Sequence, residues 1–198
     1  MIASHSKSQR PSFKFAFALA TLIFGSALIA EEVEFSYTLE DNHGIDFSEI
    51  KNGPLSIAKF TDERDVADPN VVIAGDLGDI SGGISATTPL AAIVEDALRQ
   101  GFVIGGAELS DSNDGLVLHG QLTVAEANIT DRRGVESIRM TIRAKVQLRN
   151  GSRELWQNTI FGRDYAPVSE GIEAALSNAL NKLVDSLVND DYFLIQML

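Results

Sequence analysis

The sequence predicts an α+β fold: an antiparallel or mixed sheet of about five strands with two amphipathic helices packed on one face. Residues 138–149 alternate apolar and polar without interruption, as a strand does when one face is buried and the other is wet. Residues 88–101 and 169–188 instead place apolar side chains three and four positions apart, as amphipathic helices do. The order of strands, helix, strands, helix favours a two-layer sandwich.

Both helices carry boundary signals. Thr88 is the expected N-cap of the first helix, Pro89 its first residue and Gly101 its C-terminal stop. The next three residues, 102–104, are expected to form a short strand. Ser169 is the expected cap of the second helix.

Alternation and turn residues predict the longer strands. The expected strands are 33–38, 55–60, 116–126, 138–149 and 154–163. Asn150-Gly151 between the last two is a strong hairpin signal. Residues 61–87 are acidic and rich in glycine, and are expected to form a long loop that is either mobile or functional.

The N-terminus has the layout of a secretory signal. Basic residues precede an apolar run at 15–30, and Glu31 and Glu32 then end it. The run is 16 residues, shorter than the roughly 20 that span a bilayer, although an uncleaved anchor is the alternative. We expect residues 1–30 to be removed, with cleavage after Ala27 or after Ala30.

The mature chain is expected to be one domain without disulfides. Residues 31–54 are expected to form a strand and a polar linker, and residues 55–198 a single α+β domain, because the clear periodic elements begin at Leu55. The chain has no cysteine, so its core must supply the stability. Removing the three basic residues before Glu31 leaves 13 basic against 28 acidic residues, a net charge of −15. Such a charge repels nucleic acid and anionic lipid surfaces.

The span from about Leu55 to Val188 resembles the YajG-type family of envelope lipoproteins. The matching features, in order, are Phe60, Asp62 and Arg64, then Pro89-Leu90, Gly101-Phe102, the Asn150-Gly151 hairpin and the last helix. The resemblance implies a periplasm-facing accessory domain, similar in layout to lipoproteins that assist outer-membrane assembly or lipid transport. It supplies no catalytic residues. Glu31 stands where the lipid-bearing cysteine would be, so no thioether anchor can form.

The residues point to no catalytic or metal centre. His43 lies in a polar stretch, and His119 in the middle of a strand is expected on its polar face, so neither belongs to a nucleophilic triad. The stretch 111–115 begins like a calcium loop, but Leu122 occupies the position of the bidentate glutamate. No cofactor and no metal are therefore expected.

Two functions remain open. The first is a non-enzymatic, periplasmic accessory or binding protein, soluble or peripherally associated with the envelope. We expect its partner to be a protein or an envelope component. The alternative is a small periplasmic enzyme that uses carboxylates of the 61–87 loop, for which a deep pocket lined by Asp62, Asp65 and Asp76 would be required.

A basic stripe is the candidate binding site. Arg139, Arg143, Lys145 and Arg149 share one face of a strand, because residues two apart point the same way. The simpler interpretation is that they pair across strands with Glu126, Glu136 or Glu154.

The register of the hairpin decides where Trp156 lies. A two-residue Asn150-Gly151 turn, slightly favoured, places Trp156 and Ile160 on the basic face as anchors for a partner. A three-residue turn with a bulge would bury both and leave Leu155 and Phe161 outside.

Overall fold

The structure, a computed structural model, describes residues 31–39, 44 and 46–198, and it confirms the predicted α+β fold. The predicted signal peptide and most of the stretch around His43 lie outside the described residues. The strands are β1 (Glu31–Val33), β2 (Leu55–Ile57), β3 (Thr61–Asp62), β4 (Val71–Ile73), β5 (Ile84–Ala86), β6 (Leu116–Arg132), β7 (Val135–Asn150) and β8 (Arg153–Pro167). The helices are α1 (Leu90–Ile104), α2 (Gly171–Val188) and α3 (Asp191–Met197), with a 3-10 turn η1 (Val168–Glu170) before α2.

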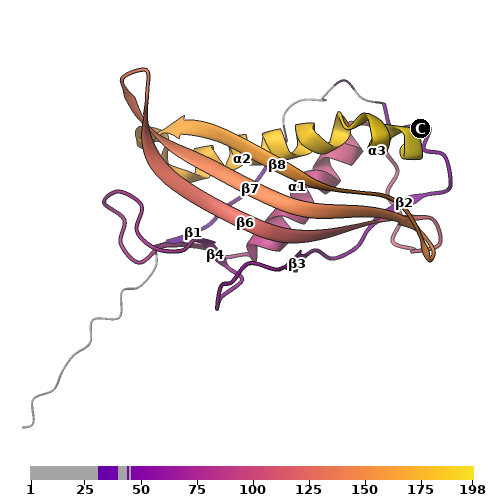
Figure 1. Cartoon of the computed structure of the whole chain (residues 1–198), viewed down its shortest axis with the longest axis horizontal. Coiled ribbons are helices and arrows are strands. Elements are labelled where there is room, and N and C mark those ends of the chain that lie inside the picture. Colours follow the sequence, from indigo (N-terminus) through magenta and orange to yellow (C-terminus); the bar gives the residue numbers. More distant parts are fainter. Residues whose placement is uncertain (1–30, 40–43, 45) are drawn as a thin grey trace, which may run out of the picture.

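The main sheet is mixed. Its order is β2-β6-β7-β8, and β3 also pairs with β6 beyond the end of β2. The long strands β6, β7 and β8 are antiparallel, whereas β2 and β3 run parallel to β6. A small second sheet has the order β1-β5-β4 and lies at one end of the long strands (Figure 1).

Helices α1 and α2 cover one face of the long strands, which leaves the other face open (Figure 1). Every second residue of β7 from Ile138 to Leu148 is buried in the core beneath these helices, as the alternation predicts. Gly162 of β8 lies where α2 comes closest, because a Cβ there would be only 1.8 Å from the carbonyl oxygen of Ala179. We call the uncovered side of β6, β7 and β8 the outer face.

The N-terminal segment belongs to the same core. Tyr37, Leu39 and Phe47 are buried with it, and the Tyr37 hydroxyl donates to Asn181 Oδ1 of α2 at 2.7 Å. Burial, helped by nearby carboxylates, raises the pKa of Tyr37. Residues 31–54 are therefore more than a strand and a polar linker. Sequence pattern missed this because single apolar residues in a polar stretch carry no period.

The first helix continues past its predicted stop. It runs to Ile104, so residues 102–104 form its last turn and the predicted short strand is wrong. Gly101 lies inside the helix, where a Cβ would be 2.6 Å from a methyl group of Val184 in α2. The glycine thus allows two helices to approach and does not end one. Pro89, not Thr88, occupies the N-cap position.

Other boundaries also differ from the prediction. The first strand ends at Val33, not Thr38, and the 61–87 region carries three short strands, β3, β4 and β5, where a single loop was expected. Ser169 lies in η1, and no side-chain hydrogen bond caps α2. The short helix α3 was not predicted. None of the helices in the described residues is long and apolar enough to cross a membrane.

Candidate functional site

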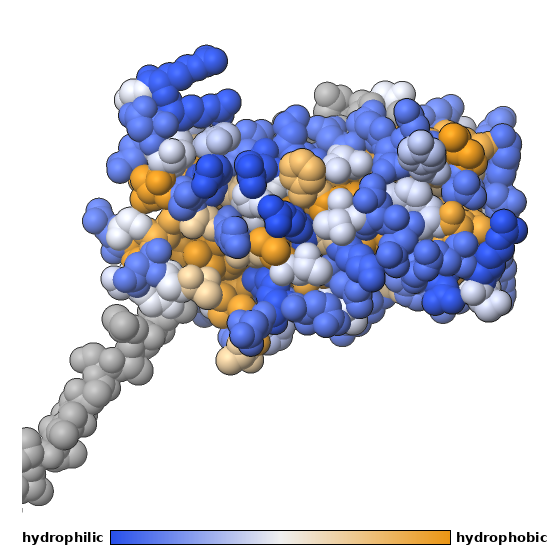
Figure 2. Space-filling model, viewed as in Figure 1, coloured by the Kyte–Doolittle hydropathy of each residue, from blue (hydrophilic) through white to orange (hydrophobic). Residues whose placement is uncertain are grey.

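Three long strands build the outer face in rows of facing residues. Arg143 of β7 stands between Val124 of β6 and Phe161 of β8. The row beside it is Gln121, Lys145 and Thr159, and the next is His119, Gln147 and Gln157. In a view of this face, hydrophilic side chains cover most of the surface and apolar ones show between them (Figure 2).

The basic stripe lies where strand parity places it. Arg143 and Lys145 are exposed, and Arg139 and Arg149 are half-buried, while every second residue from Met140 to Leu148 points into the core. All four basic side chains therefore belong to the outer face. Their role in binding stays a prediction.

The stripe forms no internal ion pairs in the described part of the chain. Arg139 donates to Asn128 Oδ1 at 2.9 Å, and Arg149 donates to the Ser152 carbonyl at 3.0 Å. Arg143 and Lys145 have no side-chain hydrogen bond and no ion pair with any described residue. Glu154, one of the expected partners, instead accepts a hydrogen bond from Gln147. Cross-strand pairing with glutamate does not account for these cations.

Trp156 does not lie on the basic face. The hairpin turns at Gly151 and Ser152, with Asn150 facing Arg153, and Leu155 bulges between two paired positions. Trp156 consequently faces Leu148 and is buried, with 8% of its surface exposed. Its indole nitrogen donates to Asp190 Oδ1 at 3.2 Å, which satisfies the polar end of the ring. The predicted turn at Asn150-Gly151 is therefore wrong by one residue, and the predicted position of Trp156 on the basic face is also wrong.

Phe161, and not Trp156, supplies the exposed aromatic side chain next to the basic stripe. The bulge at Leu155 shifts the parity of β8, so Ile160 is buried and Phe161 is 55% exposed. The sequence had left this arrangement open as the alternative, because a hairpin with a bulge places Phe161 outside the core. An exposed aromatic ring opposite an unpaired arginine is the composition found at energetic centres of protein interfaces.

A polar depression lies beside the stripe. It has a volume of about 300 Å³ and is lined by Lys59, Thr61, His119, Gly120, Gln121, Lys145, Gln147 and Gln157. Burial lowers the pKa of His119, and the charge of Arg149 lowers it further. The His119 side chain is exposed on the polar side of its strand, as predicted.

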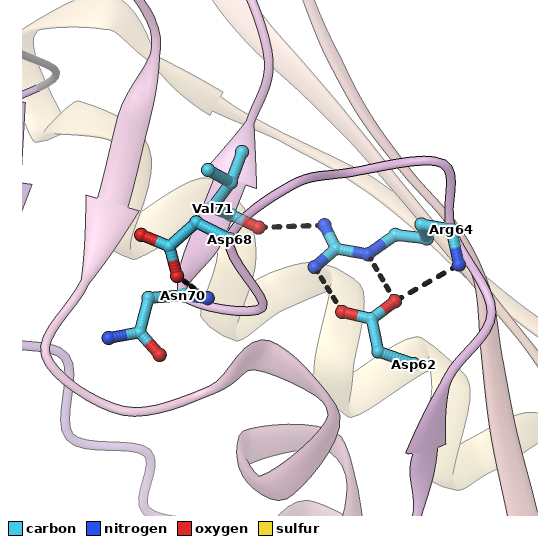
Figure 3. A network of polar contacts seen from close by, with 5 residues as sticks. All are labelled: Asp62, Arg64, Asp68, Asn70 and Val71. Atoms are coloured by element: carbon cyan, nitrogen blue, oxygen red, sulfur yellow. Dashed lines mark hydrogen bonds and ion pairs between the residues drawn. The ribbon is translucent and has the colours of Figure 1, made fainter.

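The carboxylates of the 61–87 region have separate partners. Asp62 Oδ1 accepts from the Arg64 backbone and Nε, and Oδ2 accepts from the same guanidinium at 2.6 Å, while Arg64 also donates to the Val71 carbonyl (Figure 3). Asp76 accepts from the Gly82 backbone, and Asp65 lines a different, shallow depression of about 200 Å³. Asp62, Asp65 and Asp76 therefore do not gather around one pocket.

Arg64 controls the protonation of Asp62. Burial acts to raise the pKa of Asp62, but the hydrogen bonds and charge of Arg64 outweigh it and hold the pKa below its usual value. Within residues 31–39, 44 and 46–198, no group of three His, Cys, Asp or Glu side chains could hold a metal ion.

The fold has relatives among solved structures. No protein-family model and no curated protein matches the chain. The chain is similar to protein XCC0632 from Xanthomonas campestris, of family DUF330, with 16% identity and a TM-score of 0.56, over 80% of this chain and 93% of that one. This likeness shows a shared fold.

Bacterial lipoproteins also occur among the structural neighbours. One is a minor lipoprotein from Acinetobacter baumannii, with 12% identity and a TM-score of 0.38, over 63% of this chain and 91% of that one. Another is lipoprotein GNA1162 from Neisseria meningitidis, with 14% identity and a TM-score of 0.27, over 65% of this chain and 94% of that one. Both scores are too low to carry a structural argument, and membership of the YajG-type family stays a prediction.

Proposed function

We propose that this protein is a non-enzymatic accessory protein of the cell envelope whose outer face docks an acidic protein. One observation carries the proposal: Arg143 and Lys145 are exposed, with no side-chain partner among the described residues, beside the exposed ring of Phe161. We call these three residues the docking centre. An unpaired cation at a surface gains most from an external carboxylate, because no internal pair has to be broken first.

The partner's chemistry follows from the surface that receives it. Three long paired strands form a rigid platform, so little conformational freedom is lost when a partner binds. Arginine and aromatic side chains are enriched among the residues that dominate protein interfaces. A protein segment that carries carboxylates around an apolar side chain would match both components of the docking centre.

The envelope location rests on the N-terminal sequence. A basic stretch, a short apolar run and Glu31 at its end have the layout of an export signal. We further propose a periplasmic, soluble or peripheral protein that assists outer-membrane assembly or lipid transport, as the resemblance to YajG-type lipoproteins implies.

The carboxylate geometry supports a non-enzymatic role. General acid–base catalysis by paired carboxylates requires that one of them has a raised pKa. Asp62, the most buried candidate, has a lowered pKa and is held by Arg64. This geometry favours a binding role over acid–base chemistry in the 61–87 region.

Reversing the charge of the docking centre should abolish capture of the partner. The double variant R143E/K145E should retain little acidic protein from an envelope extract, and wild-type capture should fall as salt rises, because the attraction is screened. F161S should weaken capture at all salt concentrations. Affinity chromatography with quantitative mass spectrometry measures all three effects.

K51E/K182E is the matched control. It makes the same change in net charge at exposed positions off the outer face, one in the loop before β2 and one on α2. It should capture the partner as the wild type does. Equal losses in both double variants, or retention of anionic lipid vesicles in place of a protein, would contradict the proposed partner.

A further inference from the structure

The polar depression beside the docking centre is built on a rigid edge of the sheet. Lys59 lies between β2 and β3, and the residues on either side of it are fixed. Ala58 donates its N–H to the Leu118 carbonyl at 2.9 Å, and Phe60 donates its N–H to the Glu95 carboxylate at 3.0 Å. The Phe60 ring is buried over Gly120, in the space where a Cβ would lie. Lys59 is therefore presented outward by an anchored backbone.

Charges of one sign meet in this depression. Lys59 and Lys145 enter from two different segments, His119 contributes an imidazole, and none of the described lining residues carries a carboxylate. Among the described residues, neither ammonium group has an ion-pair or hydrogen-bond partner. Like charges gathered without a counter-ion are mutually repulsive, so an anion placed between them relieves the repulsion.

The lining suits a phosphate group. Lysine ammonium groups bind phosphate as point charges, so they need no bidentate geometry to hold it. The described lining residues include lysine but no arginine, and the amide groups of Gln121 and Gln157 can donate to further oxygens. A volume of about 300 Å³ is at the small end of ligand sites, which span about 300–1,000 Å³.

We propose that this depression binds the phosphate group of a small molecule or of a lipid headgroup, held by Lys59 and Lys145 with His119 at its side. This inference stands apart from the docking of a protein. Lys59 and His119 are outside the docking centre, and only Lys145 is common to the two sites.

His119 provides a direct probe of occupancy. The positive charge of Arg149 adds to burial in keeping the imidazole neutral. A bound phosphate would offset that charge and favour the imidazolium, so it should raise the pKa of His119. The NMR signals of the His119 ring, assigned with H119Q, report this change and do not depend on any activity.

Titration of the purified protein with inorganic phosphate tests the site. We expect saturable shifts of the His119 signals and a higher His119 pKa. K59Q should weaken phosphate binding roughly tenfold, the effect of losing one charge-assisted hydrogen bond. The control K182Q removes a lysine from the helical layer and should leave the binding unchanged. No His119 response, an equal response to sodium chloride at matched ionic strength, or equal affinity in K59Q would overturn the proposal.

Two further probes distinguish the source of the phosphate. If glycerol 3-phosphate competes with inorganic phosphate for the depression, the natural ligand is a soluble phosphorylated compound. A His119 shift with phosphatidylglycerol vesicles, without competition by glycerol 3-phosphate, would support a lipid headgroup. If neither glycerol 3-phosphate nor the vesicles affected the His119 signals, the proposal that the depression binds a phosphorylated ligand would be overturned. Because R143E and F161S leave Lys59 and His119 in place, loss of phosphate binding and loss of protein docking are separate results.

Discussion

Replacing Phe47 by alanine should lower the free energy of unfolding by about 3–5 kcal/mol, the range for removing a buried phenylalanine ring. Phe47 is 1% exposed, and its ring meets Phe102 of α1 edge-on at a centroid distance of 5.1 Å. Phe102 is 6.0 Å from Phe193 of α3, which is 5.0 Å from Trp156 of β8. The ring of Phe47 therefore joins the N-terminal segment to two helices and the sheet.

Urea denaturation of F47A and the wild type measures this loss. Far-UV circular dichroism and Trp156 fluorescence should report one shared transition with a lower midpoint and an unchanged slope. E49A changes an exposed side chain in the same segment and should stay within about 0.5 kcal/mol of the wild type. A loss below about 1 kcal/mol in F47A would mean that the N-terminal segment is not part of the cooperative domain.

The variant R64M should lose a comparable amount of stability, about 3–5 kcal/mol, because it leaves a buried carboxylate without its partner. The side chains of Arg64 and Asp62 are only 6% and 12% exposed. Arg64 also donates to the Val71 carbonyl at 2.7 Å, so the same guanidinium ties β3 to β4 (Figure 3). Thermal or urea unfolding at neutral pH measures the loss.

The pH dependence separates charge from packing. Arg64 lowers the pKa of folded Asp62 below its unfolded value, so the stability from this pair is fully present above the unfolded pKa. It is lost as the pH falls through the folded pKa. The difference in the free energy of unfolding between wild type and R64M should therefore be largest near neutral pH. It should shrink below about pH 4, near the unfolded pKa of aspartate.

Two controls accompany R64M. The double variant D62N/R64M should recover part of the loss, because it removes the unpaired charge. R99M breaks a more exposed pair with Glu95 and should cost no more than about 1 kcal/mol. A double variant as unstable as R64M, or no change with pH, would show that the charge of Asp62 is not the cause.

Periodic patterns predicted the parts of the fold that repeat. The alternation along β7 placed Met140, Ile142 and Ala144 in the core and Arg143 and Lys145 outside. Strand parity is a local property, so one sequence is enough to read it. The apolar stripes of α1 and α2 were predicted for the same reason.

Periodic patterns could not predict single contacts between segments that are distant in the sequence. Phe47 is an isolated apolar residue, and its burial depends on Phe102, which lies 55 positions later in the chain. Gly101 looked like a helix stop, but the approach of α2 requires a small residue there. Trp156 was misplaced because one bulge at Leu155 reverses which side chains of β8 face the core.

The polar depression was hidden for a similar reason. Lys59 and His119 lie 60 positions apart, and they meet only because β3 extends the parallel pairing that β2 begins along β6. The sequence predicted the face on which His119 lies. No pattern in the sequence indicated that Lys59, at the edge of the sheet, would line the same depression as His119.

Photo-crosslinking from position 161 tests most directly whether the outer face docks an acidic protein. A benzoylphenylalanine in place of Phe161 should trap one acidic protein in the native envelope, and the adduct should disappear when R143E/K145E is added. The same probe in place of Tyr192, which is 76% exposed on α3, should not trap that protein. Identical adducts from both positions, or a position-161 adduct that survives the charge reversal, would contradict docking at the outer face.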